Sequence, residues 1–211
     1  MKISTSILNA ENIIKSILEL NNTKTSYIHI DVMDGKFVTN TKFNTIKEIS
    51  DINNNSKHKL DIHLMVENPI EYINKLNNMN IEYVTFHIEV EKNIKEIISK
   101  IKSMGYKAGI SIKPNTNLNK LVPYLKDIDL LLIMSVEPGK GGQEFISNTI
   151  ERIKKIKEII TNYNIEIEVD GGINEKTISL LKNIDIAVVG SYITKSNNYS
   201  DKIDTLLEKS I

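Results

Sequence analysis

The chain has 211 residues, with 27 lysines and arginines against 27 aspartates and glutamates, so its formal net charge is zero. This balance gives no electrostatic reason to expect a nucleic acid or a membrane surface as a partner. The absence of cysteine excludes disulfide bonds and thiolate chemistry. No apolar run approaches the roughly 20 residues of a membrane span, and the N-terminal residues turn polar after Leu8. We therefore expect a cytoplasmic protein.

Short runs rich in β-branched residues alternate along the chain with amphipathic runs of helical period. The predicted strands span residues 3–8, 27–33, 60–66, 83–88, 107–112, 130–136, 165–171 and 186–191. The predicted helices span residues 11–20, 44–52, 69–76, 93–105, 118–125, 150–160, 176–184 and 201–211. Alternation of this kind predicts parallel strands joined by right-handed crossovers.

Eight strand–helix units in 211 residues fit the lower end of the size range of a (βα)8 barrel. We therefore predict an α/β fold, a single (βα)8 TIM barrel that spans residues 1–211 as one domain. A doubly wound open sheet is the alternative. The barrel is favoured because polar residues recur near the ends of several separate strands, which converge in a barrel but mostly diverge in an open sheet.

Four polar residues near strand ends are candidate metal ligands. The stretch YIHIDVMDG places His29 and Asp31 on one face of the second strand, where they should be buried. His63 lies near the end of the third strand, and Asp170 ends the seventh. Residues two apart on a strand are about 6.5–7 Å from each other, so their side chains can converge on one ion with bonds of about 2 Å.

Each of these four residues alone is more often a hydrogen-bonded part of a barrel interior than a ligand. Burying two aspartates and two histidines together without a cation would be costly, so the set predicts one divalent cation per subunit. Nitrogen and oxygen ligands without sulfur suit Zn, Fe(II), Mn or Co, and the sequence does not choose among them.

Other side chains flank the predicted ligands. Asp61 lies deeper on the strand face of His63, so it is predicted either to orient that imidazole or to make an internal hydrogen bond. His87 and Glu89 alternate in the same way on the fourth strand and are assigned a supporting or structural role. Three methionines are either ordinary core residues or a hydrophobic floor around a reacting carbon. They are Met33, Met65 and Met134.

Three glycine-bearing segments follow late strands. Gly171–Gly172 and Gly190–Ser191 lie after the seventh and eighth strands, where barrels commonly bind phosphate through backbone N–H groups. The segment EPGKGGQEF after the sixth strand is predicted to be a closing lid or a part of the same phosphate site. Each segment alone could be a tight turn. Together they predict a phosphorylated small-molecule substrate.

The chain resembles the ribulose-phosphate 3-epimerase family in six segments, which are in chain order HIDVMDGKFVTN, DIHLMVENP, VTFHIE, MSVEPGKGGQEF, VDGGI and VVGS. The match runs from Ser6 to Ser191, and the combination is far more specific than any single motif. The resemblance implies a (βα)8 barrel, one divalent cation per subunit and oligomers of identical subunits.

The resemblance also implies roles for individual residues. The positions that match the family's metal ligands are His29, Asp31, His63 and Asp170. Asp31 and Asp170 also match its acid–base pair. The positions that match its substrate contacts are Ser6, His63, Gly139, Lys140, Gly141, Gly142, Asp170, Gly171, Gly172, Gly190 and Ser191.

Three positions depart from the family's pattern. Thr5 and Thr39 each stand where a proline is usual, and Lys140 replaces a phenylalanine of the glycine loop. None of them is a predicted metal ligand. We hypothesise that the Lys140 ammonium contacts the substrate phosphate.

The implied reaction interconverts D-ribulose 5-phosphate and D-xylulose 5-phosphate by removing a proton at C3 and returning one to the opposite face. Two alternatives are a 3-epimerase of a ketohexose 6-phosphate such as D-allulose 6-phosphate, and a non-catalytic barrel that binds metal and sugar phosphate. A phosphate-binding barrel of tryptophan or histidine biosynthesis is disfavoured, because the HIDVMD pattern does not suit it.

Overall fold

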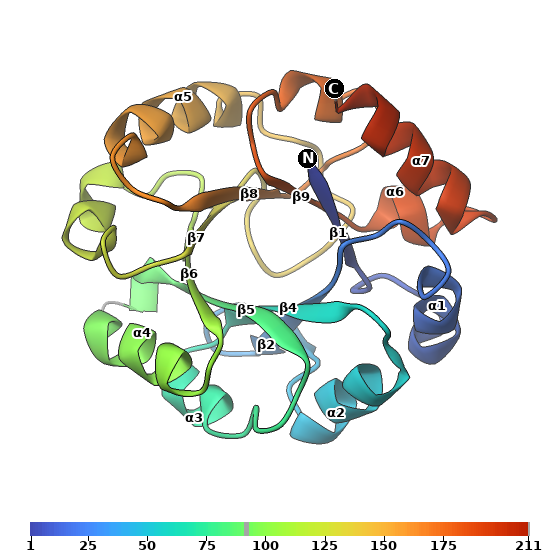
Figure 1. Ribbon diagram of the computed structural model, residues 1–211, viewed down its shortest axis with the longest axis horizontal. Helices are drawn as coiled ribbons and strands as arrows, with labels where there is room; N and C mark the ends of the chain where they lie inside the picture. The colour runs from blue at the N-terminus through green and yellow to red at the C-terminus, as the bar shows by residue number, and fades with distance from the viewer. Residues whose placement is uncertain (91–92, 211) are drawn as a thin grey trace.

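The computed structural model describes residues 1–90 and 93–210. Within these residues, eight parallel strands form a sheet in the order β1-β9-β8-β7-β6-β5-β4-β2, and pairing of β1 with β2 closes it into a barrel (Figure 1). The strands are β1 (Lys2–Ser6), β2 (Tyr27–Asp34), β4 (Lys59–Met65), β5 (Ile81–His87), β6 (Lys107–Ile112), β7 (Leu130–Met134), β8 (Glu166–Asp170) and β9 (Ile186–Val189). The predicted α/β class and TIM barrel are confirmed.

Helices surround the barrel on its outer side (Figure 1). The α-helices are α1 (Ile13–Leu20), α2 (Ile46–Asn55), α3 (Pro69–Ile73), α4 (Ile94–Ser103), α5 (Thr149–Ile160), α6 (Ser191–Thr194) and α7 (Tyr199–Lys209). The 3-10 helices are η1 (Ile88–Val90), η2 (Leu118–Tyr124) and η3 (Ile178–Leu180). Among the described residues, no helix is both long and apolar enough to cross a bilayer.

The sequence predicted every barrel strand to within three residues at either end, but two of the predicted helices differ. The helix predicted at 118–125 is the 3-10 helix η2, which contains Pro123, a residue that cannot donate a backbone hydrogen bond. The helix predicted at 176–184 shortens to η3. The predicted last helix extends to Ile211, which lies outside the described residues.

Local signals explain where several helices begin and end. Thr45 and Glu48 form a reciprocal capping box at the start of α2. Pro69 occupies the first turn of α3, where its missing N–H is harmless. Gly105 follows α4 with φ +82°, the left-handed conformation that ends many helices. The short strand β3 (Thr41–Lys42) pairs antiparallel with the end of β2 and was not predicted.

The two largest apolar clusters of the described residues hold the barrel together. The larger core fills the space between the strands and the helices, and isoleucines from both layers dominate it. A smaller cluster inside the barrel includes Tyr27, Tyr83 and Leu132. At the amino ends of the strands, the Tyr83 hydroxyl donates to Glu166, and Lys2 Nζ forms an ion pair with Glu166 at 2.6 Å. This end is closed by side chains, so the opposite end remains for binding.

Two glycines directly after β8 adopt backbone conformations that other residues avoid. Gly171 has φ +123° and Gly172 has φ +64°. A Cβ atom on Gly172 would overlap the backbone of Phe145 in the loop after β7. The close approach of these two loops therefore requires a residue without a side chain.

We expect Gly172→Ala to lower the free energy of unfolding by about 2–4 kcal/mol, because a backbone clash is added to left-handed strain of about 1–2 kcal/mol. Gly105→Ala is the matched control, since Gly105 also has positive φ but a Cβ there would meet nothing within 4 Å. Its loss should be about 1 kcal/mol. Urea denaturation of both variants measures the difference, and equal losses would contradict the role of the loop contact.

Candidate active site

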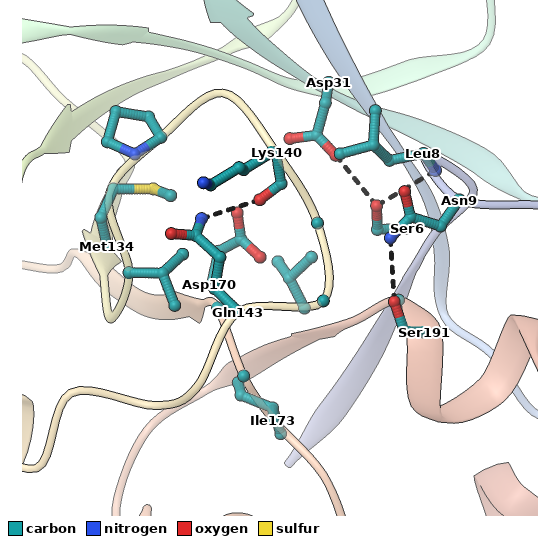
Figure 2. A pocket seen from close by; sticks show the side chains of 18 of the residues that line it. Ser6, Leu8, Asn9, Asp31, Met134, Lys140, Gln143, Asp170, Ile173 and Ser191 are labelled. Atoms are coloured by element: carbon teal, nitrogen blue, oxygen red, sulfur yellow. Dashed lines mark hydrogen bonds between the residues drawn. The ribbon is translucent and has the colours of Figure 1, made fainter.

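A cavity of about 320 Å³ opens at the carboxyl ends of the barrel strands. The structure brings most of the predicted site residues to its walls, where Asp31 and Asp170 enter it from different strands (Figure 2). The other predicted residues on the walls are Ser6, Met33, Met65, Met134, Gly139, Lys140, Gly141, Gly142, Gly171, Gly172, Gly190 and Ser191. The predicted residues His29 and His63 are completely buried, behind this surface.

The four predicted metal ligands form one compact cluster. His29, Asp31, His63 and Asp170 each offer one ligand atom, and these atoms all lie within 4.8 Å of one another. The register of the sheet explains this, because Asp31 of β2 is paired with His63 of β4. Their side chains leave adjacent strands toward the same interior point.

His29 is held by a carboxylate on its far side. Its Nδ1 atom lies 2.7 Å from Asp61 Oδ2, which also accepts a hydrogen bond from Ser4 Oγ at 2.7 Å. His29 and Asp61 are register partners in the β2–β4 pairing. Of the two roles predicted for Asp61, the internal hydrogen bond is the one observed. Asp61 orients His29 and not His63, because a neighbour in register on the next strand is closer than a residue two positions along the same strand.

His63 has a different set of neighbours. Its Nδ1 atom lies 3.2 Å from Asp31 Oδ1, and its Nε2 atom lies 2.9 Å from Nε2 of His87. His87 Nδ1 in turn lies 3.0 Å from Glu89 Oε2. Glu89 and His87, which were assigned a supporting or structural role, thus form a line of contacts that ends at the predicted ligand His63.

The two aspartates of the cavity have opposite electrostatic surroundings. Burial would raise the pKa of Asp31, but His29 and His63 beside it hold that pKa well below its usual range. Burial raises the pKa of Asp170 to about 7, and the negative charge of Asp31 adds to this effect. Without a cation, the site near neutral pH therefore contains one ionised aspartate and one that readily carries a proton.

The histidines also differ in their charge. Burial would lower the pKa of His29, but Asp61 and Asp31 raise it well above its usual value. Burial lowers the pKa of His63, and it lowers the pKa of His87 to about 4. His87 and His63 are therefore neutral near pH 7, and His29 is the imidazole that balances the buried carboxylates.

Glu168 lies on β8 beneath the cluster, and the sequence did not single it out. Its side chain is completely buried, and burial together with the nearby Asp61 carboxylate raises its pKa well above the usual range. A neutral Glu168 can donate a hydrogen bond to Asp61. The strand pattern contained the signal, because Glu168 shares a strand face with Asp170.

The cluster fits a divalent cation. His29 Nε2 is buried, has no hydrogen-bond partner, and lies 3.4 Å from Asp31 Oδ1. A buried nitrogen without a partner is costly in a protein interior. Two imidazole nitrogens and two carboxylates are also a common donor set for a divalent transition metal. A cation among these atoms would satisfy the unpaired nitrogen and offset the negative charge.

The glycine segments meet on one side of the cavity. Close packing brings Gly141 against Asn9, Gly142 toward Ser191, and Gly190 toward Ser6. Asn9 Nδ2 donates to Ser191 Oγ at 2.9 Å, which joins the loop after β1 to the start of α6 (Figure 2). Segments that are far apart in the sequence thus form one polar wall.

The loop between β7 and α5 curves over the centre of the barrel mouth (Figure 1). Gln143 Nε2 donates to the carbonyl oxygens of Glu137 and Lys140, at 2.6 and 2.8 Å, and so holds the loop in a ring. Asn40 Nδ2 donates to the carbonyl oxygen of Gly139 at 2.7 Å, which ties the loop to the segment after β2. Gln143, Asn9 and Asn40 were missed, because an isolated amide side chain in a loop has no distinctive sequence pattern.

The chain is similar to known proteins over nearly its whole length. The sequence model described as the ribulose-phosphate 3 epimerase family matches residues 2–194. A ribulose-phosphate 3-epimerase of Helicobacter pylori strain J99 is 35% identical over 212 residues, covering 98% of this chain and 96% of that protein. One from Methanocaldococcus jannaschii is 33% identical over 222 residues, covering 100% and 92%.

Solved structures support the barrel at lower identity. The 3-keto-L-gulonate-6-phosphate decarboxylase of Vibrio cholerae aligns with a TM-score of 0.72 at 12% sequence identity, covering 99% of this chain and 97% of that one. At this identity the likeness concerns the fold alone.

We expect the affinity for a divalent cation to rise with pH between about 5.5 and 7. Asp170 has a pKa of about 7 and His29 a raised pKa, so each carries a proton in acid that a cation must displace. Each displaced proton weakens binding by up to about tenfold per pH unit below its pKa. Titration of metal-free protein with Mn²⁺ against a chelating indicator measures the slope, and pH-independent affinity over this range would contradict the assignment.

Proposed function

Since the chain belongs to the ribulose-phosphate 3-epimerase family, whose members are isomerases, we propose that the cavity at its barrel mouth epimerises C3 of a ketopentose phosphate with two aspartates and one divalent cation. The observation that carries this proposal is that Asp31 and Asp170 reach one cavity from separate strands and belong to one cation-binding cluster. The reaction interconverts D-ribulose 5-phosphate and D-xylulose 5-phosphate.

His29, Asp31, His63 and Asp170 would hold the cation. The donor set supports Zn, Fe(II), Mn or Co as its identity. A cation there supplies positive charge next to the substrate's ketone oxygen, which stabilises the enediolate by several kcal/mol. Asp61 keeps the Nδ1 side of His29 occupied, so that Nε2 faces the cluster.

Inversion at C3 requires a base on one face of the carbon and an acid on the other. The C3–H bond breaks, its proton goes to one carboxylate, and its electron pair moves toward the ketone at C2. The second carboxyl group then delivers a proton to the opposite face. Asp31 projects from β2 and Asp170 from β8, with β1 and β9 between them, so the two groups approach the cavity from separate directions.

Each carboxylate can act as the base on its own face of C3, and as the acid once it carries a proton. In the cation-free protein the surroundings of Asp31 and Asp170 already give the two groups unequal affinity for a proton. The reverse reaction exchanges the two roles. Ser6 Oγ donates to Asp31 Oδ2 at 2.9 Å and fixes the orientation of that carboxylate.

The remaining walls suit the rest of the substrate. Met33, Met65 and Met134 are at most 2% exposed and line the cavity without offering a strong hydrogen bond, which suits a planar carbon intermediate. The polar wall of Gly142, Gly171–Gly172 and Gly190–Ser191 would bind the phosphate through backbone N–H groups.

The proposal extends to setting and assembly. We place the protein in the cytoplasm as an oligomer of identical subunits with a sugar phosphate as its small-molecule partner, and without nucleic-acid or membrane partners. The neutral net charge of the sequence is consistent with this.

A ketohexose 6-phosphate such as D-allulose 6-phosphate is the alternative substrate. The relatives compared here are named for the ribulose phosphate reaction, which favours the pentose. Turnover of the two ketose phosphates under the same conditions separates them. Binding of either one without exchange of the C3 hydrogen for solvent deuterium would instead indicate a non-catalytic binding protein.

We expect Asp31→Asn and Asp170→Asn each to lower kcat by at least about 10³-fold, because each removes one of the two proton carriers. Asp51→Asn, on the exposed face of α2, is the matched control and should retain full activity. A coupled assay with ribulose 5-phosphate measures turnover, and circular dichroism verifies the fold. Substantial turnover in either site variant would refute the two-aspartate scheme.

Substitution of Lys140 tests the proposed contact between its ammonium group and the substrate phosphate. Its side chain belongs to the cavity wall and comes from the loop after β7 (Figure 2). We expect Lys140→Ala to raise KM for the phosphorylated substrate by about 3–10-fold with little change in kcat, because it removes charge attraction and leaves the proton carriers intact. The Lys126→Ala variant, at an exposed site outside the cavity, is the control. An unchanged KM for Lys140→Ala would exclude the contact.

A further inference from the structure

His87 and Glu89 lie outside the cavity wall and outside the predicted ligand set, yet they are connected to it. His87 ends β5, is completely buried, and faces His63 through paired Nε2 atoms at 2.9 Å. Its other nitrogen, Nδ1, lies 3.0 Å from Glu89 Oε2 in η1. Glu89, His87 and His63 are called the Glu89 relay below.

The outer end of the relay fixes where the protons lie. Glu89 Oε1 accepts a hydrogen bond from the backbone N–H of Lys113 at 2.9 Å and another from the Thr116 hydroxyl. Both of these groups donate, and these contacts together with His87 hold the pKa of Glu89 at about 2, so Glu89 is a carboxylate that accepts hydrogen bonds. His87 must carry its proton on Nδ1, since an unprotonated nitrogen facing a carboxylate at this distance would be repelled.

The proton positions then follow inward along the relay. A neutral imidazole has one donor and one acceptor nitrogen, so His87 accepts at Nε2. Only one proton fits between two nitrogens at this separation, so His63 must donate from its own Nε2. With a cation bound, the Nδ1 atom of His63 is unprotonated and faces Asp31 Oδ1 at 3.2 Å, so that two acceptors meet at the cation site and the cation satisfies both.

We propose that Glu89 and His87 are positioning residues that set the tautomer of His63 and so make its Nδ1 a metal ligand. The inference rests on the proposed cation site. It adds an outer carboxylate, acting through a second histidine, to the direct carboxylate contact that Asp61 makes with His29. Carboxylate–histidine support of this kind commonly changes metal affinity by about 10–100-fold.

The surroundings of the relay hold it in place. Arg152 of α5 donates to the carbonyl oxygens of Thr116 and Lys113, at 2.9 and 3.4 Å, and so fixes the loop that binds Glu89. The Phe37 ring covers His87 at a centroid distance of 4.8 Å, and the ammonium of Lys113 lies 4.3 Å from the centre of that ring. Shielding from water keeps the hydrogen bonds of the relay strong.

The first experiment reads the tautomers directly in wild-type protein saturated with Zn²⁺, which is diamagnetic. We expect two-bond ¹H–¹⁵N spectra of ¹⁵N-histidine-labelled protein at pH 7 to show the proton on Nε2 of His63 and on Nδ1 of His87. The opposite tautomer of His63 would overturn the proposal. Uptake of Zn²⁺ is verified first with a chelating indicator, so that an absent cation site is distinguished from an incorrect tautomer.

The second experiment measures the affinity for Co²⁺ by competition with a chelating indicator, together with the visible absorption of the bound Co²⁺. His87→Phe removes the acceptor of His63 but keeps an aromatic ring, so affinity should fall by about 10–100-fold and the spectrum should change. His87→Gln offers an amide oxygen to His63 and should recover a large part of the loss. His58→Gln, at a half-buried histidine that contacts Leu20, is the matched control and should bind as the wild type does.

Wild-type affinity and an unchanged Co²⁺ spectrum in His87→Phe would overturn the proposal. Equal losses in His87→Phe and His87→Gln would also overturn it, since a packing defect would not depend on a hydrogen-bond acceptor. Failure of wild-type protein to bind Co²⁺ would refute the cation site itself, whereas binding of Co²⁺ with the opposite His63 tautomer in the Zn²⁺-loaded protein would refute the relay alone.

Discussion

The Asp31 carboxylate, enclosed by two completely buried imidazoles, is the interaction on which the rest of the site depends. A carboxylate in this position must be balanced, because the interior offers no water to solvate it. His29 and His63 keep it ionised, and its charge in turn raises the pKa of Asp170. The unlike behaviour of two chemically identical side chains, one ionised and one able to carry a proton, follows from this single placement.

The parallel register of β2 and β4 creates that placement. His29 is paired with Asp61 and Asp31 with His63, so each histidine has an acid beside it on the neighbouring strand. His29, Asp31 and His63 belong to the cation cluster, and Asp61 supports it from deeper in the barrel. His63 has no carboxylate behind it on β5, and the relay through His87 to Glu89 supplies one from farther away. Each histidine thus has a supporting carboxylate, which His29 contacts directly and His63 reaches through a second histidine.

Stability and chemistry occupy opposite ends of the barrel. The amino ends of the strands are closed by Tyr83, Glu166 and Lys2, which are joined by a hydrogen bond and an ion pair. At the carboxyl ends, loops with positive-φ glycines approach one another without side chains between them. This arrangement makes the loops depend on positions such as Gly172, where a Cβ atom would overlap the backbone of Phe145.

The sequence by itself determined the alternation of strands and helices, the closed barrel, and the residues that gather at its mouth, because strand period and strand ends are local properties. It also indicated the family through ordered motifs. Only the tertiary structure decided which groups touch. Asp61 could not be assigned to His29, nor His87 to His63, because cross-strand register is set by the whole sheet. Glu168 and the amides of Asn9 and Gln143 acquired roles only when distant loops met. The spacing of residues along the chain shows which side chains lie on the same face of a strand. Contacts between strands and loops depend instead on how all of the elements pack.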